Sequence, residues 1–105
     1  MKIELFYFEG CPAWEQAAKN MQSALMAEGL SGEISLIEVK DDLKAKELRF
    51  LGSPSFRIND VDLWPEERQR YNLNCRVYST PDGLSGAPTV EMLRAKLQAF
   101  SKSPL

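Results

Sequence analysis

The sequence predicts a single α/β domain with the element order β-α-β-α-β-β-α, in which helices flank a mixed central sheet. In the first half of the chain, short apolar runs alternate with stretches of helical spacing. Turn residues and short extended segments follow, and a last amphipathic stretch comes near the end. A length of 105 residues allows one hydrophobic core. We therefore expect one domain over residues 1–101 and a frayed tail over 102–105.

The first two elements have the clearest patterns. Residues 2–8 form an almost continuous apolar run rich in aromatic residues, as in a central strand that is buried on both faces. After Gly10, apolar residues recur at helical spacing, with Pro12 near the first helical position and Gly29 as the stop signal. This pattern predicts the first helix.

The next strand and helix continue the alternation. Residues 33–39 place β-branched and apolar side chains mostly two positions apart, which predicts a strand. Asp41 and Asp42 follow as candidate caps of a short helix that ends before Gly52. Two strands joined by a crossover helix in one sheet favour a parallel pair with a right-handed connection.

The second half of the chain predicts antiparallel strands. Residues 55–58 form a short strand, and the pair at 59–60, Asn-Asp, tolerates positive φ and predicts a tight turn into residues 61–63. Residues 64–74 are polar and charged, so we expect an excursion over the surface before extended structure resumes at 76–80.

The last segments are a loop and a helix. Residues 81–88 are a loop by composition, with two prolines and two glycines. From Thr89 to Phe100 the apolar residues fall on one helical face, which predicts the final helix.

Composition and charge exclude several function classes. The net charge of −2, with acids and bases interspersed, provides no basic stripe for nucleic acid or an anionic membrane. The N-terminal apolar run is too short for a signal peptide or a membrane span, so we expect a cytoplasmic protein. Two cysteines and no histidine cannot complete a four-ligand zinc site. We therefore expect free thiols, no metal and no cofactor.

Two short motifs resemble the thioredoxin superfamily. EGCPAW at residues 9–14 places a cysteine and a proline between the first strand and the first helix, and GSP at 52–54 precedes the third strand. The resemblance implies a thioredoxin-like fold and a cis peptide bond before Pro54, facing the redox cysteine Cys11. With CRVY at 75–78 and GLSGAP at 83–88, the sequence is similar to small bacterial thioredoxin-like proteins, some of them labelled alkylmercury lyase-like.

The sequence departs from the family pattern at Trp14, where the family has its resolving cysteine. A dithiol cycle within this motif is therefore excluded. A thiol at a helix N-terminus, as predicted for Cys11, still meets unpaired N–H groups that favour a thiolate. The carboxylates of Glu9 and Glu15 oppose this effect. The alternative is that Cys11 is a small buried apolar residue.

Cys75 is a possible second thiol. We call the end of the domain that carries Cys11 the active end. If an extended segment from Arg76 runs toward it, a rise of about 3.3 Å per residue places Cys75 roughly 15 Å from that end. A disulfide needs Cα atoms within about 7 Å, so pairing requires the preceding loop to fold back. The alternative is a buried packing residue.

The main functional prediction is a monothiol redox protein. Cys11 attacks a disulfide, peroxide or electrophile, and a protein or small-molecule thiol such as glutathione resolves the product. One alternative is a non-catalytic binding module, favoured by Trp14, which we expect to be core or pocket wall. Another is thiol-based binding of a soft metal. The predicted site comprises catalytic Cys11 and Pro54, bordered by Pro12, Trp14, Ser53, Gly83, Leu84 and Ser85.

Overall fold

A four-stranded mixed sheet with the spatial order β2-β1-β3-β4 lies at the centre of the computed structural model, which describes residues 1–101. Strands β1 and β2 are parallel, whereas β3 runs antiparallel to both β1 and β4. A separate hairpin pairs β5 with β6. The strands are Ile3–Tyr7 (β1), Ile34–Glu38 (β2), Ser55–Ile58 (β3), Val61–Asp62 (β4), Tyr78–Thr80 (β5) and Gly83–Ser85 (β6).

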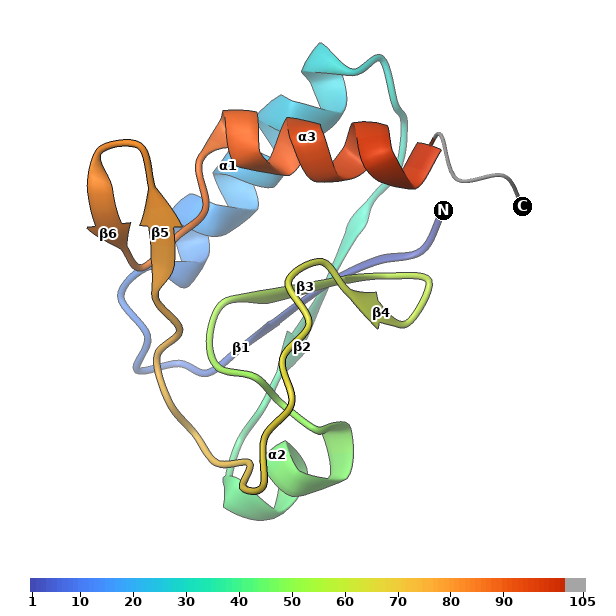
Figure 1. The fold of residues 1–105 in the computed structure, drawn as a ribbon. Coiled ribbons are helices and arrows are strands. Elements are labelled where there is room, and N and C mark those ends of the chain that lie inside the picture. Colours follow the sequence, from blue (N-terminus) through green and yellow to red (C-terminus); the bar gives the residue numbers. More distant parts are fainter. Residues whose placement is uncertain (102–105) are drawn as a thin grey trace.

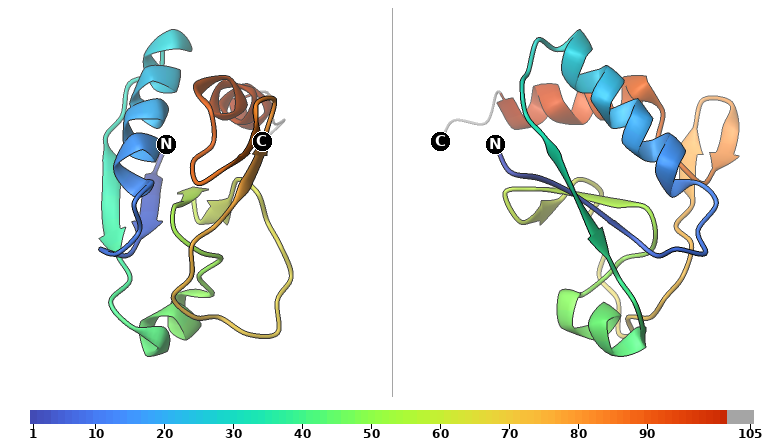
Figure 2. Two further views of the ribbon diagram at one scale, coloured as in Figure 1. Left: turned by 90° about the vertical axis from the view of Figure 1, so that its left-hand side faces the viewer. Right: turned by 180° about the vertical axis from the view of Figure 1, so that it is seen from behind.

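Three helices among the described residues pack against this sheet. Helices α1 (Trp14–Ala27) and α3 (Val90–Ser101) lie side by side on one face, and α2 (Asp42–Leu48) lies at the opposite end of the molecule (Figures 1 and 2). The structure therefore confirms a mixed α/β domain. No helix within residues 1–101 combines the length and the apolar composition that crossing a membrane requires. The tail expected at 102–105 lies outside the described residues.

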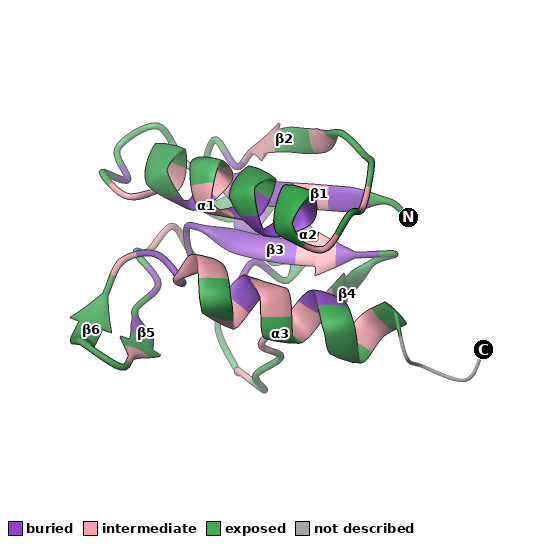
Figure 3. Cartoon of the chain, turned by 90° about the horizontal axis from the view of Figure 1, so that it is seen from above, coloured by how far each residue is buried: buried purple, intermediate pink, exposed green. Residues whose placement is uncertain are grey.

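The core sits between the sheet and the pair α1 and α3. Buried residues gather on β1, on β3 and on the helix faces turned toward them (Figure 3). Ile3 and Leu5 of β1 pack in this main cluster, while Phe6, one position away, packs in a second cluster that includes Ala45 of α2. This alternation follows the period of two in a strand and explains why β1 is apolar on both faces.

Several local predictions are confirmed. Asp41 caps α2, because its side chain accepts a hydrogen bond of 2.8 Å from the backbone N–H of Lys44. Asn59 and Asp60 have φ values of 50° and 71° and form the turn between β3 and β4.

Other boundaries differ from the predictions. Helix α1 begins at Trp14 rather than near Pro12, because Cys11 first closes a turn in which its N–H donates to the Phe8 carbonyl over 3.0 Å. The extended segment predicted at 76–80 is a strand only from Tyr78. The loop predicted at 81–88 is wrong for residues 83–85, which form β6.

Candidate functional site

Cys11 lies in the turn between β1 and α1, with only 4% of its surface exposed. Its thiol donates a long hydrogen bond of 3.5 Å to the carbonyl oxygen of Ser53. Helix α1 starts at Trp14 with Ala13 as its N-cap residue, so Cys11 precedes the helix N-terminus by two residues instead of capping it. The thiol therefore faces the backbone before β3 rather than solvent.

The segment that Cys11 faces is fixed on several sides. Ser53 is fully buried, and its hydroxyl accepts a hydrogen bond of 3.3 Å from the Phe8 N–H. The Ser53–Pro54 peptide bond is cis, which is the isomer that the resemblance implied. The Pro54 carbonyl accepts a 2.5 Å hydrogen bond from the hydroxyl of Tyr78, and burial raises the pKa of that hydroxyl. Tyr78 thus holds this segment in place.

Cys75 lies directly across from Ser53. The Ser53 N–H donates to the Asn74 carbonyl and the Arg76 N–H donates to the Ser53 carbonyl, both over 2.8 Å, which makes a parallel bridge between Ser53 and Cys75. The predicted separation of roughly 15 Å from the active end is therefore wrong. It assumed a strand running from Arg76, whereas residues 74–76 instead pair with the backbone beside Cys11.

Cys11 influences the pKa of the Cys75 thiol. Partial desolvation raises the pKa of the Cys75 thiol, and both the charge of Cys11 and a side-chain hydrogen bond with Cys11 raise it further. Both cysteines are free; Cys11 is buried and Cys75 is exposed. The alternative that Cys75 is a buried packing residue is therefore wrong, because the paired backbone leaves its side chain at the surface.

Gly52 allows the two segments to come this close. Its φ is 112°, and a Cβ atom added there would collide with the side chain of Asn74 and lie 3.1 Å from the Cβ of Arg76. A φ in this range strains any residue with a Cβ. Glycine at position 52 thus removes both a conformational and a steric obstacle to the pairing of Ser53 with Cys75.

A buried ion pair anchors the segment that carries Cys75. Arg76 is 5% exposed, and its guanidinium contacts both carboxylate oxygens of Asp62 at 3.1 Å and the Ser55 hydroxyl at 3.0 Å. It also donates to the Trp64 carbonyl. Burial raises the pKa of Asp62, while the charge of Arg76 opposes the shift. This ion pair was not predicted from the sequence, where its only signal was a single arginine between apolar neighbours in CRVY.

Trp14 occupies the position where the family pattern has its second cysteine. Its ring stacks on Tyr7, with centroids 4.1 Å apart and an angle of 24° between the planes. Trp14 is partly buried and packs against the main core, as expected of a core or wall residue. The neighbouring Pro12 is exposed.

The predicted loop residues lie on the β5–β6 hairpin. Gly83, Leu84 and Ser85 are exposed, and 79% of the Leu84 surface meets solvent. The next residue, Gly86, lies against the turn between β1 and α1, since a Cβ atom added to Gly86 would be 2.9 Å from the Cβ of Ala13. The role of residues 83–85 at the site therefore stays a prediction.

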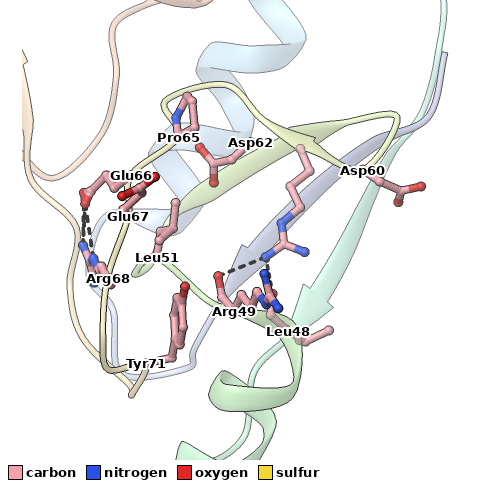
Figure 4. Close-up of a pocket in the computed structure, with 11 residues that line it drawn as sticks. Leu48, Arg49, Leu51, Asp60, Asp62, Pro65, Glu66, Glu67, Arg68 and Tyr71 are labelled. Atoms are coloured by element: carbon pink, nitrogen blue, oxygen red, sulfur yellow. Dashed lines mark hydrogen bonds and ion pairs between the residues drawn. The ribbon is translucent and has the colours of Figure 1, made fainter.

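A separate cavity of about 500 Å³ lies between the end of α2, the β3–β4 turn and residues 65–71 (Figure 4). Both signs of charge line it, and several of these groups already have partners. Arg57 donates to the carbonyls of Leu48 and Arg49, and Arg68 contacts Glu66. Neither cysteine lines this cavity. Its mixed charges fit the solvated face that the sequence indicated here.

No protein-family model, curated protein or solved structure matches this chain. Among residues 1–101 there is no group of three or more histidine, cysteine, aspartate or glutamate side chains arranged to hold a metal ion.

Proposed function

We propose that this chain is a thioredoxin-like protein that exchanges thiols and disulfides through Cys11. One observation carries the proposal: the Cys11 thiol lies 3.5 Å from the carbonyl oxygen of Ser53. The two motifs behind the resemblance, far apart in the sequence, thus meet at this contact. A cytoplasmic location belongs to the same proposal, since free thiols persist in reducing compartments.

The chemistry is thiol–disulfide exchange. The deprotonated Cys11 sulfur attacks one sulfur of an external disulfide, the old S–S bond breaks, and the released thiolate takes up a proton. A mixed disulfide on Cys11 remains. In the simplest cycle an external thiol such as glutathione attacks this bond and returns Cys11 to the thiol.

Access to Cys11 determines how this exchange proceeds. With 4% exposure, the Cys11 sulfur meets an external disulfide only when the turn opens, or when an exposed neighbouring thiol passes the disulfide inward. The same burial favours the second candidate function, a non-catalytic thioredoxin-like binding module with an inert Cys11. Partly buried Trp14 in place of a cysteine favours it too.

Soft-metal binding also stays a prediction. Thiolates select soft ions such as Cu(I), and two cysteines serve such an ion only when they lie close together. Cys11 and Cys75 both lie at Ser53, which supports such a site. Metal binding that survives Cys75→Ser and fails in Cys11→Ser would support a site centred on Cys11.

The direct test uses Cys75→Ser, which retains Cys11 as the only cysteine. We expect incubation of the folded protein with glutathione disulfide to add one glutathionyl group at Cys11, measured by intact mass and reversed by dithiothreitol. The Cys11→Ser/Cys75→Ser variant is the control and should stay unmodified. Modification of Cys75→Ser only in denaturant would contradict the proposal and favour the binding module.

A further inference from the structure

Cys11 and Cys75 meet at one backbone unit, Ser53. The Ser53 carbonyl accepts the Cys11 thiol at 3.5 Å and the Arg76 N–H at 2.8 Å, so Cys75 is the residue bridged to Ser53. Neighbouring strands lie about 4.8 Å apart, which puts the Cys75 backbone within one strand spacing of Ser53. Cys11 and Cys75 therefore both lie against the same short segment before Pro54.

The two cysteines are brought together by the same residue. The Cys11 thiol contacts the carbonyl of Ser53, and the backbone of Ser53 is paired with that of Cys75. Desolvation and the charge of Cys11 both raise the pKa of the Cys75 thiol, as expected for neighbouring thiols. Closing a disulfide from this arrangement requires the sulfur atoms to approach to about 2 Å.

The two cysteines differ in their exposure to solvent. Cys75 is exposed, whereas Cys11 is 4% exposed. An external disulfide therefore meets the sulfur of Cys75 first. Trp14 stacks on Tyr7 and packs against the core, so the position that holds a second cysteine in the family pattern is occupied by a packing residue.

We propose that Cys75 is the second redox cysteine of this site and forms a reversible disulfide with Cys11. The inference rests on the proposed exchange at Cys11, but places that exchange second: Cys11 attacks the mixed disulfide formed on Cys75, so no external thiol is needed to resolve it. The substrate class is a disulfide, either glutathione disulfide or a disulfide of another protein. Cys75 is the attacking cysteine and Cys11 the resolving one.

The two steps balance. Cys75 loses its proton to solvent and attacks one sulfur of the external disulfide, whose S–S bond breaks; the released thiolate takes up a proton. The Cys11 sulfur then attacks the Cys75 sulfur, breaks the mixed disulfide and gives its proton to the second released thiolate. The cysteine pair loses two electrons and two protons, and the external disulfide becomes two thiols. A dithiol reductant reverses both steps.

The test is oxidation of the full chain by glutathione disulfide, with acid quenching, intact mass and peptide mapping. We expect both free thiols to be lost together, with a Cys11–Cys75 linked peptide and no retained glutathione. Cys11→Ser should trap glutathione on Cys75, several-fold faster than Cys75→Ser traps it on Cys11.

A matched control moves the second thiol along the same segment. Val77 is 60% exposed and lies two residues beyond Cys75. In Cys75→Ser/Val77→Cys we expect glutathione to remain bound to the introduced cysteine, with no link to Cys11. An equal yield of internal disulfide in this control would overturn the assigned pairing, since it would show that any thiol on the segment suffices.

Two further outcomes distinguish failure of the Cys11–Cys75 disulfide from failure of the exchange at Cys11. Stable glutathione adducts on wild-type protein, without an internal link, would overturn the role of Cys75 and leave the monothiol exchange standing. A folded wild-type protein whose cysteines both resist glutathione disulfide would overturn both proposals.

Discussion

The backbone of Ser53 is paired with that of Cys75 in a parallel bridge, and this relationship brings the two cysteines of the chain to one place. The bridge lies outside the four-stranded sheet and depends on two hydrogen bonds of 2.8 Å. Its supports are the space left by Gly52 and the ion pair of Arg76 with Asp62. Each support can be removed separately.

Gly52→Ala should destabilise the fold and separate the cysteines. The added Cβ meets Asn74 and Arg76 at a φ of 112°, so we expect a loss of about 2–4 kcal/mol from strain and collision together. Gly83→Ala is the control, because φ there is 110° but nothing lies within 4 Å of the added Cβ. Urea unfolding measures the free energy of unfolding of both variants. Equal losses in the two variants would show that the close approach at position 52 costs nothing.

The Arg76–Asp62 pair should behave as a buried ion pair. Arg76→Met leaves the carboxylate of Asp62 without its charged partner, so we expect a loss of about 3–5 kcal/mol. Replacing both residues, in Arg76→Met/Asp62→Leu, should restore much of that loss because no charge remains buried. A double-mutant cycle from urea unfolding measures the coupling. Additive losses would contradict a direct interaction.

The pH dependence of Cys75 should report the presence of Cys11. Desolvation, then the charge of Cys11, then a hydrogen bond with Cys11 raise the pKa of Cys75, so the reactive thiolate is scarce at neutral pH. Cys11→Ala removes two of these causes and should shift the alkylation profile of Cys75 toward lower pH. Iodoacetamide rates at the Cys75 peptide measure the shift. An unchanged profile would mean that the two thiols do not interact.

Trp14→Ala should affect stability more than redox chemistry. Trp14 is partly buried and stacked on Tyr7, so its truncation should cost about 2–3 kcal/mol, less than for a fully buried ring. The yield of the Cys11–Cys75 disulfide should be retained, because Trp14 packs and does not exchange electrons. Urea unfolding measures the loss of stability, and oxidation by glutathione disulfide measures the yield of the disulfide. Loss of the disulfide in a folded Trp14→Ala protein would assign Trp14 a role in the site.

Elements with strong local patterns were predictable from the sequence. The apolar run of β1, the cap at Asp41 and the turn at Asn59 and Asp60 each depend on neighbouring residues. The contact between the Cys11 turn and Ser53 followed only from the resemblance, because it joins segments far apart in the sequence.

The position of Cys75 could not be predicted in the same way. Residues 74–76 carry no periodic pattern, and their path follows from backbone pairing with Ser53 and from the burial of Arg76. Both are long-range interactions. The strand at Gly83–Ser85 was missed for a different reason, since its glycine and its serine are typical of loops and only pairing with β5 makes it extended.

The most direct measurement of the central claim is a redox titration of wild-type protein across glutathione buffers, with the species at each ratio quantified by intact mass. We predict one transition that exchanges two electrons, from the free dithiol to the Cys11–Cys75 disulfide, with little glutathione adduct at any ratio. Accumulation of a stable adduct in place of the internal disulfide would contradict it.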